Sequence, residues 1–249
     1  MEEGVRIFKN GQYVESAQLF MRAKALDPNL LNARLYLATA YAHQYIPGAP
    51  SEENNRMGEL ATEEYKGVLQ IDSQNLSAID GLASLLYQRA GQPFDAKLFN
   101  ESRSYYQMHI RLEPKDPVPH YCVGVIDWSL AYRGNTLLRE EFNKAAWGES
   151  GSGKGLNDVD PLPEAVRLEY VRQFGMMVDE GIDSLKQAIT LKPDYDDAMD
   201  YLNLLYRRKA DMAATKSARR NYTRQANKLL FRVREIKMKK AEMAGPGKE

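Results

Sequence analysis

Cysteine and histidine are scarce in this chain. Of its 249 residues one is a cysteine, Cys122, and three are histidines, His43, His109 and His120, far apart in the sequence. A single cysteine excludes an internal disulfide and a zinc site built on cysteines, so we expect Cys122 to be packed in the interior. Because the histidines do not form a ligand set either, the sequence predicts no metal and no other cofactor.

Long apolar runs are also missing. No stretch approaches the roughly 18 consecutive apolar residues that a membrane-spanning helix needs. The first ten residues, MEEGVRIFKN, lack the basic start and apolar continuation of a signal peptide. With 43% hydrophobic and 27% charged residues, the composition is that of a soluble globular protein, and no integral membrane segment is predicted.

What the sequence does contain is an internal repeat. Four helical apolar patterns end alike, at residues 25–28 (ALDP), 70–73 (QIDS), 111–114 (RLEP) and 190–193 (TLKP). Their last residues are 45, 41 and 79 positions apart, which fits a unit of about 34 residues that carries insertions. Within each unit, small residues recur where two helices would touch, and large apolar residues recur three and four positions away.

This pattern resembles the tetratricopeptide repeat, a helix–turn–helix unit. The signature positions of the first repeat are occupied by Gly11, Tyr13, Ser16, Phe20, Ala23 and Pro28. Later repeats carry the signature in Leu37, Ala38, Tyr41, Ala61, Tyr65, Leu82, Ala83, Tyr106, Val123, Gly124, Gly181, Ala198 and Leu202. The segments HYCVGVIDWSLAYR and YDDAMDYLNLLYR are similar to segments of uncharacterised bacterial tetratricopeptide proteins.

The resemblance implies an all-α, right-handed superhelical α-α solenoid of about five helix pairs, closed by a C-terminal capping helix. We expect a single domain over residues 1–249, with repeats at about 1–30, 31–75, 76–116, 117–195 and 196–243, and a disordered tail at 244–249. Shorter insertions at 45–55 and 91–99 and a long one at about 134–175 fall at the same turn of their repeats, so all three should emerge along one edge, where partners are often recognised.

The long insertion should contain structure of its own. Residues 136–147 can form a short amphipathic helix, and the second helix of the fourth repeat should start near Pro163, with Asp160 as a possible cap. Residues 148–158 would join these parts as a flexible, Gly/Ser-rich hinge, the first place for a protease to cut. This hinge would let the helix around Phe142 and Trp147 move over a groove lined by Trp128.

Part of that hinge, GESGSGKG at residues 148–155, has the spacing of a phosphate-binding loop. The apolar run at 123–127, which ends in Asp127, could pass for the strand that holds magnesium. However, the repeat pattern places 123–127 inside a helix, residues 140–147 read as a helix rather than a strand, and Gly155 stands where the metal-binding Ser or Thr is required. Nucleotide binding therefore stays an alternative to the hinge.

The resemblance also implies that a partner binds in the concave groove lined by the first helix of each pair. The consensus positions that face this groove hold Thr39, His43, Asp80, Ser84, Tyr87, Tyr121, Val125, Trp128, Asp200, Arg207 and Arg208. They differ from the Lys/Asn/Arg set with which some members hold a chaperone's C-terminal carboxylate. Tyr87, Tyr121 and Trp128 would make the centre of the groove aromatic, unless they pack against the insertion or a neighbouring helix.

We therefore expect a non-catalytic scaffold that binds a peptide or a helix of a partner protein and has no small-molecule substrate, because no nucleophile or acid–base pair stands in a recognisable setting. A purely structural, self-associating solenoid is the other alternative. Met1 aligns with the fifth position of the first repeat, so the chain resembles a trimmed piece of a longer precursor. Its localisation, cytoplasmic or periplasmic, stays open.

Charge is unevenly distributed along the chain. Residues 207–240 hold 13 basic and two acidic side chains, whereas residues 1–206 carry a net charge of −10. A solvated basic face on a capping helix explains such a run. The alternatives are an anionic partner, such as a nucleic-acid backbone or an acidic lipid surface, and weak head-to-tail association of two copies of the chain. Nucleic acid is the less favoured partner.

Overall fold

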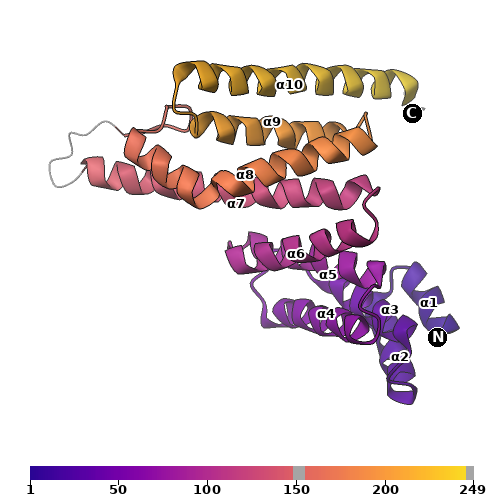
Figure 1. The fold of residues 1–249 in the computed structure, drawn as a ribbon. Coiled ribbons are helices and arrows are strands. Elements are labelled where there is room, and N and C mark those ends of the chain that lie inside the picture. The colour runs from indigo at the N-terminus through magenta and orange to yellow at the C-terminus, as the bar shows by residue number, and fades with distance from the viewer. Residues whose placement is uncertain (148–154, 245–249) are drawn as a thin grey trace. The chain divides into compact units, whose positions relative to one another are not determined.

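The chain is all-helical in the computed structural model, which describes residues 1–147 and 155–244 (Figure 1). These residues contain ten helices and no strand, and the helices follow one another as five pairs. They fall into two compact units, Met1–Pro114 and Lys115–Glu249, called here the N-terminal and the C-terminal unit. The predicted α-solenoid of about five helix pairs is confirmed, whereas the single domain stays a prediction. No helix among the described residues is both long and apolar enough to cross a bilayer.

The N-terminal unit contains three helix pairs, and each helix packs on the next one along the chain. Its helices are α1 (Glu2–Lys9), α2 (Tyr13–Leu26), α3 (Leu31–Gln44), α4 (Glu52–Ile71), α5 (Leu76–Gly91) and α6 (Ala96–Leu112). Phe20, Leu37 and Leu82 are fully buried between them. Small residues let neighbouring helices approach closely. A Cβ atom on Gly81 of α5 would lie 2.5 Å from Cζ of the Tyr65 ring of α4.

Side-chain caps fix where several of these helices begin. The Ser51 hydroxyl accepts a hydrogen bond from the backbone N–H of Asn54 at 3.1 Å, at the start of α4. Asn75 caps α5 in the same way, and the Asp95 carboxylate accepts from two backbone N–H groups at the start of α6. Such caps satisfy N–H groups that have no partner within the helix. The α1–α2 turn relies on Gly11, whose φ of 78° lies in the left-handed region.

The turns that carry the two shorter insertions lie side by side in the N-terminal unit. A Cβ atom added to Gly48, in the α3–α4 turn, would collide with the Gln92 side chain in the α5–α6 turn. These two insertions therefore share an edge, as the sequence predicts. The third insertion belongs to the C-terminal unit, and its place on a common edge stays a prediction.

The α3–α4 turn is held by one buried side chain, Asn54. Its amide donates to the carbonyls of Ile46 and Ala49 at 2.9 and 3.0 Å and accepts from the Ile46 N–H at 2.7 Å. We expect Asn54→Ala to lower the free energy of unfolding by about 1–2 kcal/mol, because three hydrogen bonds of a mostly buried side chain are lost. The neighbouring Asn55 is exposed, so Asn55→Ala should change stability by less than about 0.5 kcal/mol. Urea unfolding of both variants measures the difference.

The C-terminal unit contains two longer pairs: α7 (Pro117–Trp147) with α8 (Glu164–Leu191), and α9 (Asp196–Asp211) with α10 (Lys216–Ala244). α7 packs on both α8 and α9, α8 packs on α9, and α10 packs along α9 (Figure 1). Tyr170, Leu185 and Leu205 are fully buried in its core. Cys122, which the sequence predicts to be packed, is partly buried on α7.

The structure corrects two details of the long insertion. Residues 136–147 do not form a separate helix, because α7 continues unbroken to Trp147. At Gly134, the missing Cβ leaves room for the Phe174 ring of α8. Asp160 does not cap α8; Pro163 stands at that position, and the Asp160 carboxylate instead accepts from the Asn157 N–H at 2.9 Å.

Residues 148–154, which hold all of the phosphate-loop motif except Gly155 and most of the predicted hinge, lie outside the described residues. The element before the motif is helical, as the sequence predicts, and 123–127 lie within α7. Part of the predicted hinge, residues 155–158, is described. There the Asn143 side chain donates to the Leu156 carbonyl at 3.0 Å and accepts from the Leu156 N–H at 2.6 Å, so the end of the hinge is attached to α7.

Candidate binding surface

Five aromatic rings form a continuous row on α7 and the start of α9, called here the aromatic stripe. Tyr121, Trp128 and Tyr132 are spaced seven and four residues apart and so share one face of α7. The Tyr121 ring lies 5.0 Å from that of Tyr195 and 5.8 Å from that of Tyr201, measured between centroids. Trp128 meets Tyr201 edge-on at 5.3 Å and stacks on Tyr132 at 5.3 Å. The first helices of the fourth and fifth repeats together make this surface.

The stripe is partly open to solvent. Tyr132 is 42% exposed, and the other four residues are partly buried. Burial raises the pKa of Tyr195 to about 12 and also raises the pKa of Tyr121. Both phenols therefore stay neutral at physiological pH, and the stripe offers rings with hydroxyl groups rather than charge.

A cation lies over the ring at each end of the stripe. The Lys192 ammonium is 4.6 Å from the centroid of the Tyr195 ring. The Arg208 guanidinium is 5.7 Å from the centroid of the Tyr132 ring. These cation–π contacts orient the two terminal rings and limit the aromatic surface to the length between them.

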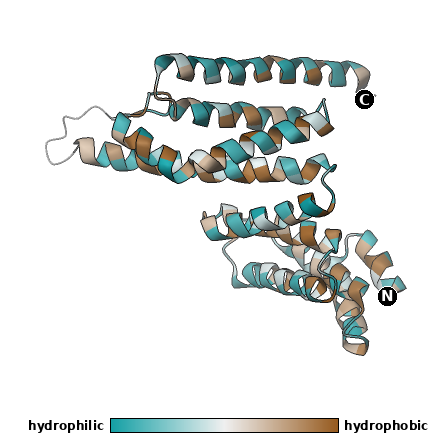
Figure 2. Cartoon of the chain, viewed as in Figure 1, coloured by the Kyte–Doolittle hydropathy of each residue, from teal (hydrophilic) through white to brown (hydrophobic). Residues whose placement is uncertain are grey.

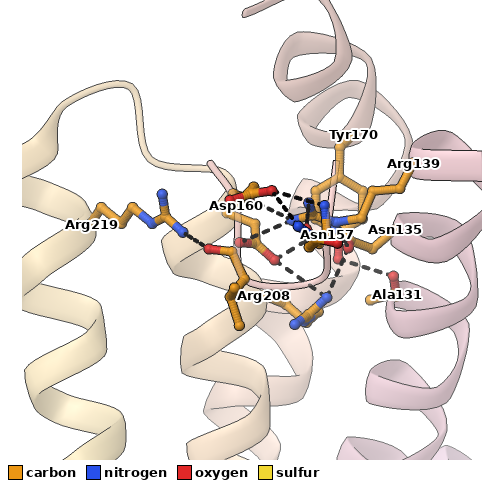
Figure 3. Close-up of polar contacts among 10 residues, drawn as sticks. Ala131, Asn135, Arg139, Asn157, Asp160, Tyr170, Arg208 and Arg219 are labelled. Atoms are coloured by element: carbon orange, nitrogen blue, oxygen red, sulfur yellow. Dashed lines mark hydrogen bonds and ion pairs between the residues drawn. The ribbon is translucent and has the colours of Figure 1, made fainter. Parts of the chain in front are cut away.

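Beyond Tyr132 the same face of α7 continues into a buried polar network (Figure 3). The Asn135 side-chain oxygen accepts from Arg139 at 2.8 Å and from Arg208 at 2.9 Å, and its amide donates to Asp211 at 3.5 Å. The Asp211 carboxylate also pairs with Arg208 at 3.3 Å and with Arg139 at 3.6 Å. Arg139 and Asp211 are only 3% and 7% exposed. Each polar group in this interior has a partner, as a buried group requires.

Burial acts on both charged partners of the network. It raises the pKa of the Asp211 carboxyl, an effect that Arg208 and Arg139 oppose. It lowers the pKa of the Arg139 guanidinium, and Asp211 opposes that effect. An arginine keeps its charge in proteins, so Arg139 and Arg208 are both cations in this network. The Asp211 carboxylate, which pairs with both, compensates their positive charge.

The network also fastens the segment that precedes α8 (Figure 3). The Arg139 guanidinium donates to the carbonyls of Asn157 and Asp160 at 2.7 and 3.0 Å. From α10, Arg219 donates to the carbonyl of Val159 at 2.8 Å. The described end of the insertion is therefore held by α7 and by α10, next to the aromatic stripe.

The C-terminal unit brings some of the predicted groove residues together and separates others. Tyr121 and Trp128 lie in the stripe, and Arg208 closes one end of it. Val125 is 6% exposed and offers almost no surface. Two further residues turn toward α10 instead, because that helix covers their side of α9. These are Asp200, paired with Lys237 at 3.0 Å, and Arg207, which donates to Asn227 at 3.1 Å.

In the N-terminal unit, three predicted groove residues contact the second helix of their own pair. The Thr39 hydroxyl lies 3.1 Å from that of Tyr65, Asp80 lies 2.6 Å from Nδ1 of His109, and Tyr87 packs edge-on against Phe99 at 5.5 Å. Ser84 is partly buried and accepts from Gln88. His43 is exposed and stacks on Tyr13 at 4.4 Å.

A separate groove of about 530 Å³ opens between α1 and α3 of the N-terminal unit. It is lined by Met1, Glu2, Val5, Arg6, Lys9, Asn32 and Tyr36. Tyr36 is the one ring among these lining residues, and it packs against Phe8 at 5.6 Å and against Phe20 at 5.2 Å. The lining of this groove is therefore mainly charged and polar, whereas the stripe is aromatic.

Consensus positions alone miss three of the five rings of the stripe. Tyr132 follows Trp128 by four residues, and Tyr201 precedes Arg208 by seven, so helical spacing could have identified both. Tyr195 lies before α9, in the turn that follows the closing Pro193. Its contact with Tyr121 depends on tertiary packing and leaves no local signal in the sequence.

Solved structures share this fold. A crystal structure of the MamA protein aligns with a TM-score of 0.62 and 15% identity over 100% of this chain and 96% of that chain. MamA residues 41 to the end from Desulfovibrio magneticus RS-1 align with a TM-score of 0.60 and 13% identity over 96% and 93%. A thermophilic TPR protein of Thermus thermophilus aligns with a TM-score of 0.45 and 16% identity over 96% and 97%.

No protein-family model and no curated protein sequence matches the chain. The likeness to MamA, at such low identity, shows the fold. Together with the five helix pairs of the described residues, it confirms the predicted tetratricopeptide-like fold.

Proposed function

We propose that this protein is a non-catalytic scaffold whose aromatic stripe binds an extended peptide or an amphipathic helix of a partner protein. The observation that carries the proposal is the row of five rings across α7 and α9, partly open to solvent and limited by a cation at each end. Tyrosine and tryptophan are the side chains most enriched at binding hot spots, because they offer a large rigid surface with a polar handle.

The geometry favours a partner that presents apolar side chains along a line. The rings follow the helix axis of α7 over three turns, so anchors spaced as in a strand or along one helix face can reach several of them. Tyr132, the most exposed ring, would be the first contact. Rings held by helices are already ordered, which reduces the entropy that binding must overcome.

Trp128 provides both the test and the readout. We expect Trp128→Ala to weaken the binding of peptides selected from a random library on the wild-type protein by about 2 kcal/mol, or roughly 30-fold. A Trp147→Phe background leaves Trp128 as the sole tryptophan, so that its fluorescence reports the contact directly in the unaltered stripe.

The matched control is Tyr36→Ala, which alters the groove of the N-terminal unit and should leave these affinities unchanged. Circular dichroism of each variant checks that the helices persist. If the selected peptides bind Trp128→Ala as tightly as the wild-type protein, or lose affinity with Tyr36→Ala instead, the stripe is not the binding surface.

A further inference from the structure

The last helix, α10, is mostly hydrophilic, with apolar residues interspersed along it (Figure 2). Its inner face packs on the C-terminal core through Tyr222, Ala226, Leu229 and Val233. Its outer face carries a row spaced by four and three residues in turn, which places every member on one side of the helix. That row consists of Arg220, Arg224, Asn227, Phe231, Arg234 and Met238, all of them exposed.

The outer face is strongly basic. α10 contains ten Lys or Arg residues and two acidic residues, Glu235 and Glu242. Four of the cations contact the rest of the C-terminal unit, namely Arg219, Arg232, Lys237 and Lys240. The other six are exposed, namely Lys216, Arg220, Arg224, Lys228, Arg234 and Lys239. A shallow hollow of about 400 Å³ lies among Arg219, Arg220, Thr223, Arg224, Asn227, Lys228 and Phe231.

Large apolar side chains project from the middle of this basic face. Phe231 is 71% exposed and Met238 is 55% exposed, two turns apart on the same side. Leu230 and Met243, exposed at 41% and 80%, lie off this row on other sides of the helix. Scattered single apolar residues are common on protein surfaces, but Phe231 and Met238 lie on one line of a 29-residue helix together with Arg224 and Arg234.

We infer that the outer face of α10 docks the protein onto an anionic phospholipid surface. The exposed cations would lie among the headgroup phosphates, while Phe231 and Met238 would enter the boundary with the acyl chains. The long stems of lysine and arginine suit this position, because they can cover apolar material while the charge stays in water.

Other anionic partners fit the face less well. The core of a protein–protein interface is depleted of charge, whereas each apolar side chain here has cations as neighbours. Nucleic acid would use the cations and could stack a base on Phe231, but it has no use for the aliphatic side chain of Met238. A lipid surface uses both kinds of side chain.

Co-sedimentation of the full chain with vesicles tests this inference. We expect binding to phosphatidylcholine vesicles that contain one third phosphatidylserine, and little binding to phosphatidylcholine alone, at about 0.15 M salt. The triple variant Arg220→Gln, Arg224→Gln, Lys228→Gln should bind on the order of tenfold or more weakly. Phe231→Ser should also weaken binding, because it removes the inserted ring and leaves the charge unchanged.

Matched controls lie elsewhere on the surface. Arg22→Gln, Lys97→Gln, Lys115→Gln removes three exposed cations, and Met176→Ser removes an apolar side chain that is 77% exposed. Both should bind vesicles as the wild-type protein does. Equal loss in the control triple variant, equal binding to neutral vesicles, or binding of a labelled duplex DNA without binding of anionic vesicles would overturn the inference. Failure of peptide binding at the aromatic stripe would not affect it.

Discussion

Replacing Arg139 by methionine should lower the free energy of unfolding of the C-terminal unit by about 3–5 kcal/mol. The variant keeps a long side chain but removes hydrogen bonds to Asn135 and to the carbonyls of Asn157 and Asp160. It also removes one of the two arginines that stabilise the charged form of Asp211, a form that burial disfavours. Both tryptophans lie in this unit, so their fluorescence during urea unfolding reports on it rather than on the N-terminal unit.

Two further variants separate the network from the general cost of losing an arginine. Arg139→Lys keeps the charge but cannot reach all three acceptors from one ammonium group, so its stability should lie between those of the wild-type protein and Arg139→Met. Arg172→Met alters an exposed arginine of the same unit and should cost less than about 0.5 kcal/mol. An Arg139→Met protein within about 1 kcal/mol of wild type would show that the network contributes little.

Gly124→Ala should also destabilise the C-terminal unit, by about 3 kcal/mol. A Cβ atom at this position would lie 2.7 and 2.9 Å from the two terminal methyl carbons of Leu185, and closer still to the Cγ atom that joins them. Leu185 is fully buried, so α7 and α8 would have to separate, and the overpacking outweighs the gain of about 1 kcal/mol that alanine brings to a helix. Urea unfolding followed by tryptophan fluorescence measures this loss.

Gly175→Ala is the matched control for this change. Gly175 lies within α8, where a new Cβ atom would meet only a Val171 methyl carbon at 3.5 Å, an ordinary contact. This variant should be as stable as wild type or up to about 1 kcal/mol more stable. Combining Gly124→Ala with Leu185→Ala should cost less than the sum of the single changes, because the smaller side chain makes room. Additive costs would contradict the collision.

The helices were predictable because the information that sets them is local. Apolar spacing marks their faces, and closing prolines such as Pro28 and Pro114 mark where the next pair can begin. Gly124 was identified as a contact point for the same reason, since small residues recur at one position in each repeat. These features require no knowledge of distant residues.

The site was less predictable because its geometry depends on distant parts of the chain. Asp200 and Arg207 stand at consensus groove positions, but α10 supplies Lys237 and Asn227 as partners and turns them away. α7 continues through the residues that the sequence predicts as a separate helix, and along it Phe174, forty residues later in the chain, packs beside Gly134. The sequence places Asp160 where it could cap α8, but its carboxylate accepts a hydrogen bond from the Asn157 N–H instead.

The polar network has a consequence for how the C-terminal unit unfolds. In a repeat protein each helix contacts mainly its neighbours in sequence, so the end helix can detach while the others persist. Here Arg219 of α10 reaches Val159, and Arg208 and Asp211 of α9 reach Asn135, across 60 to 76 residues. These bonds join the final helix pair to the pair before it, at Asn135 of α7 and at Val159 in the segment before α8. Loss of α10 therefore disturbs the segment before α8, and the four helices should open as one cooperative block, with similar protection from hydrogen exchange, rather than peel away in order.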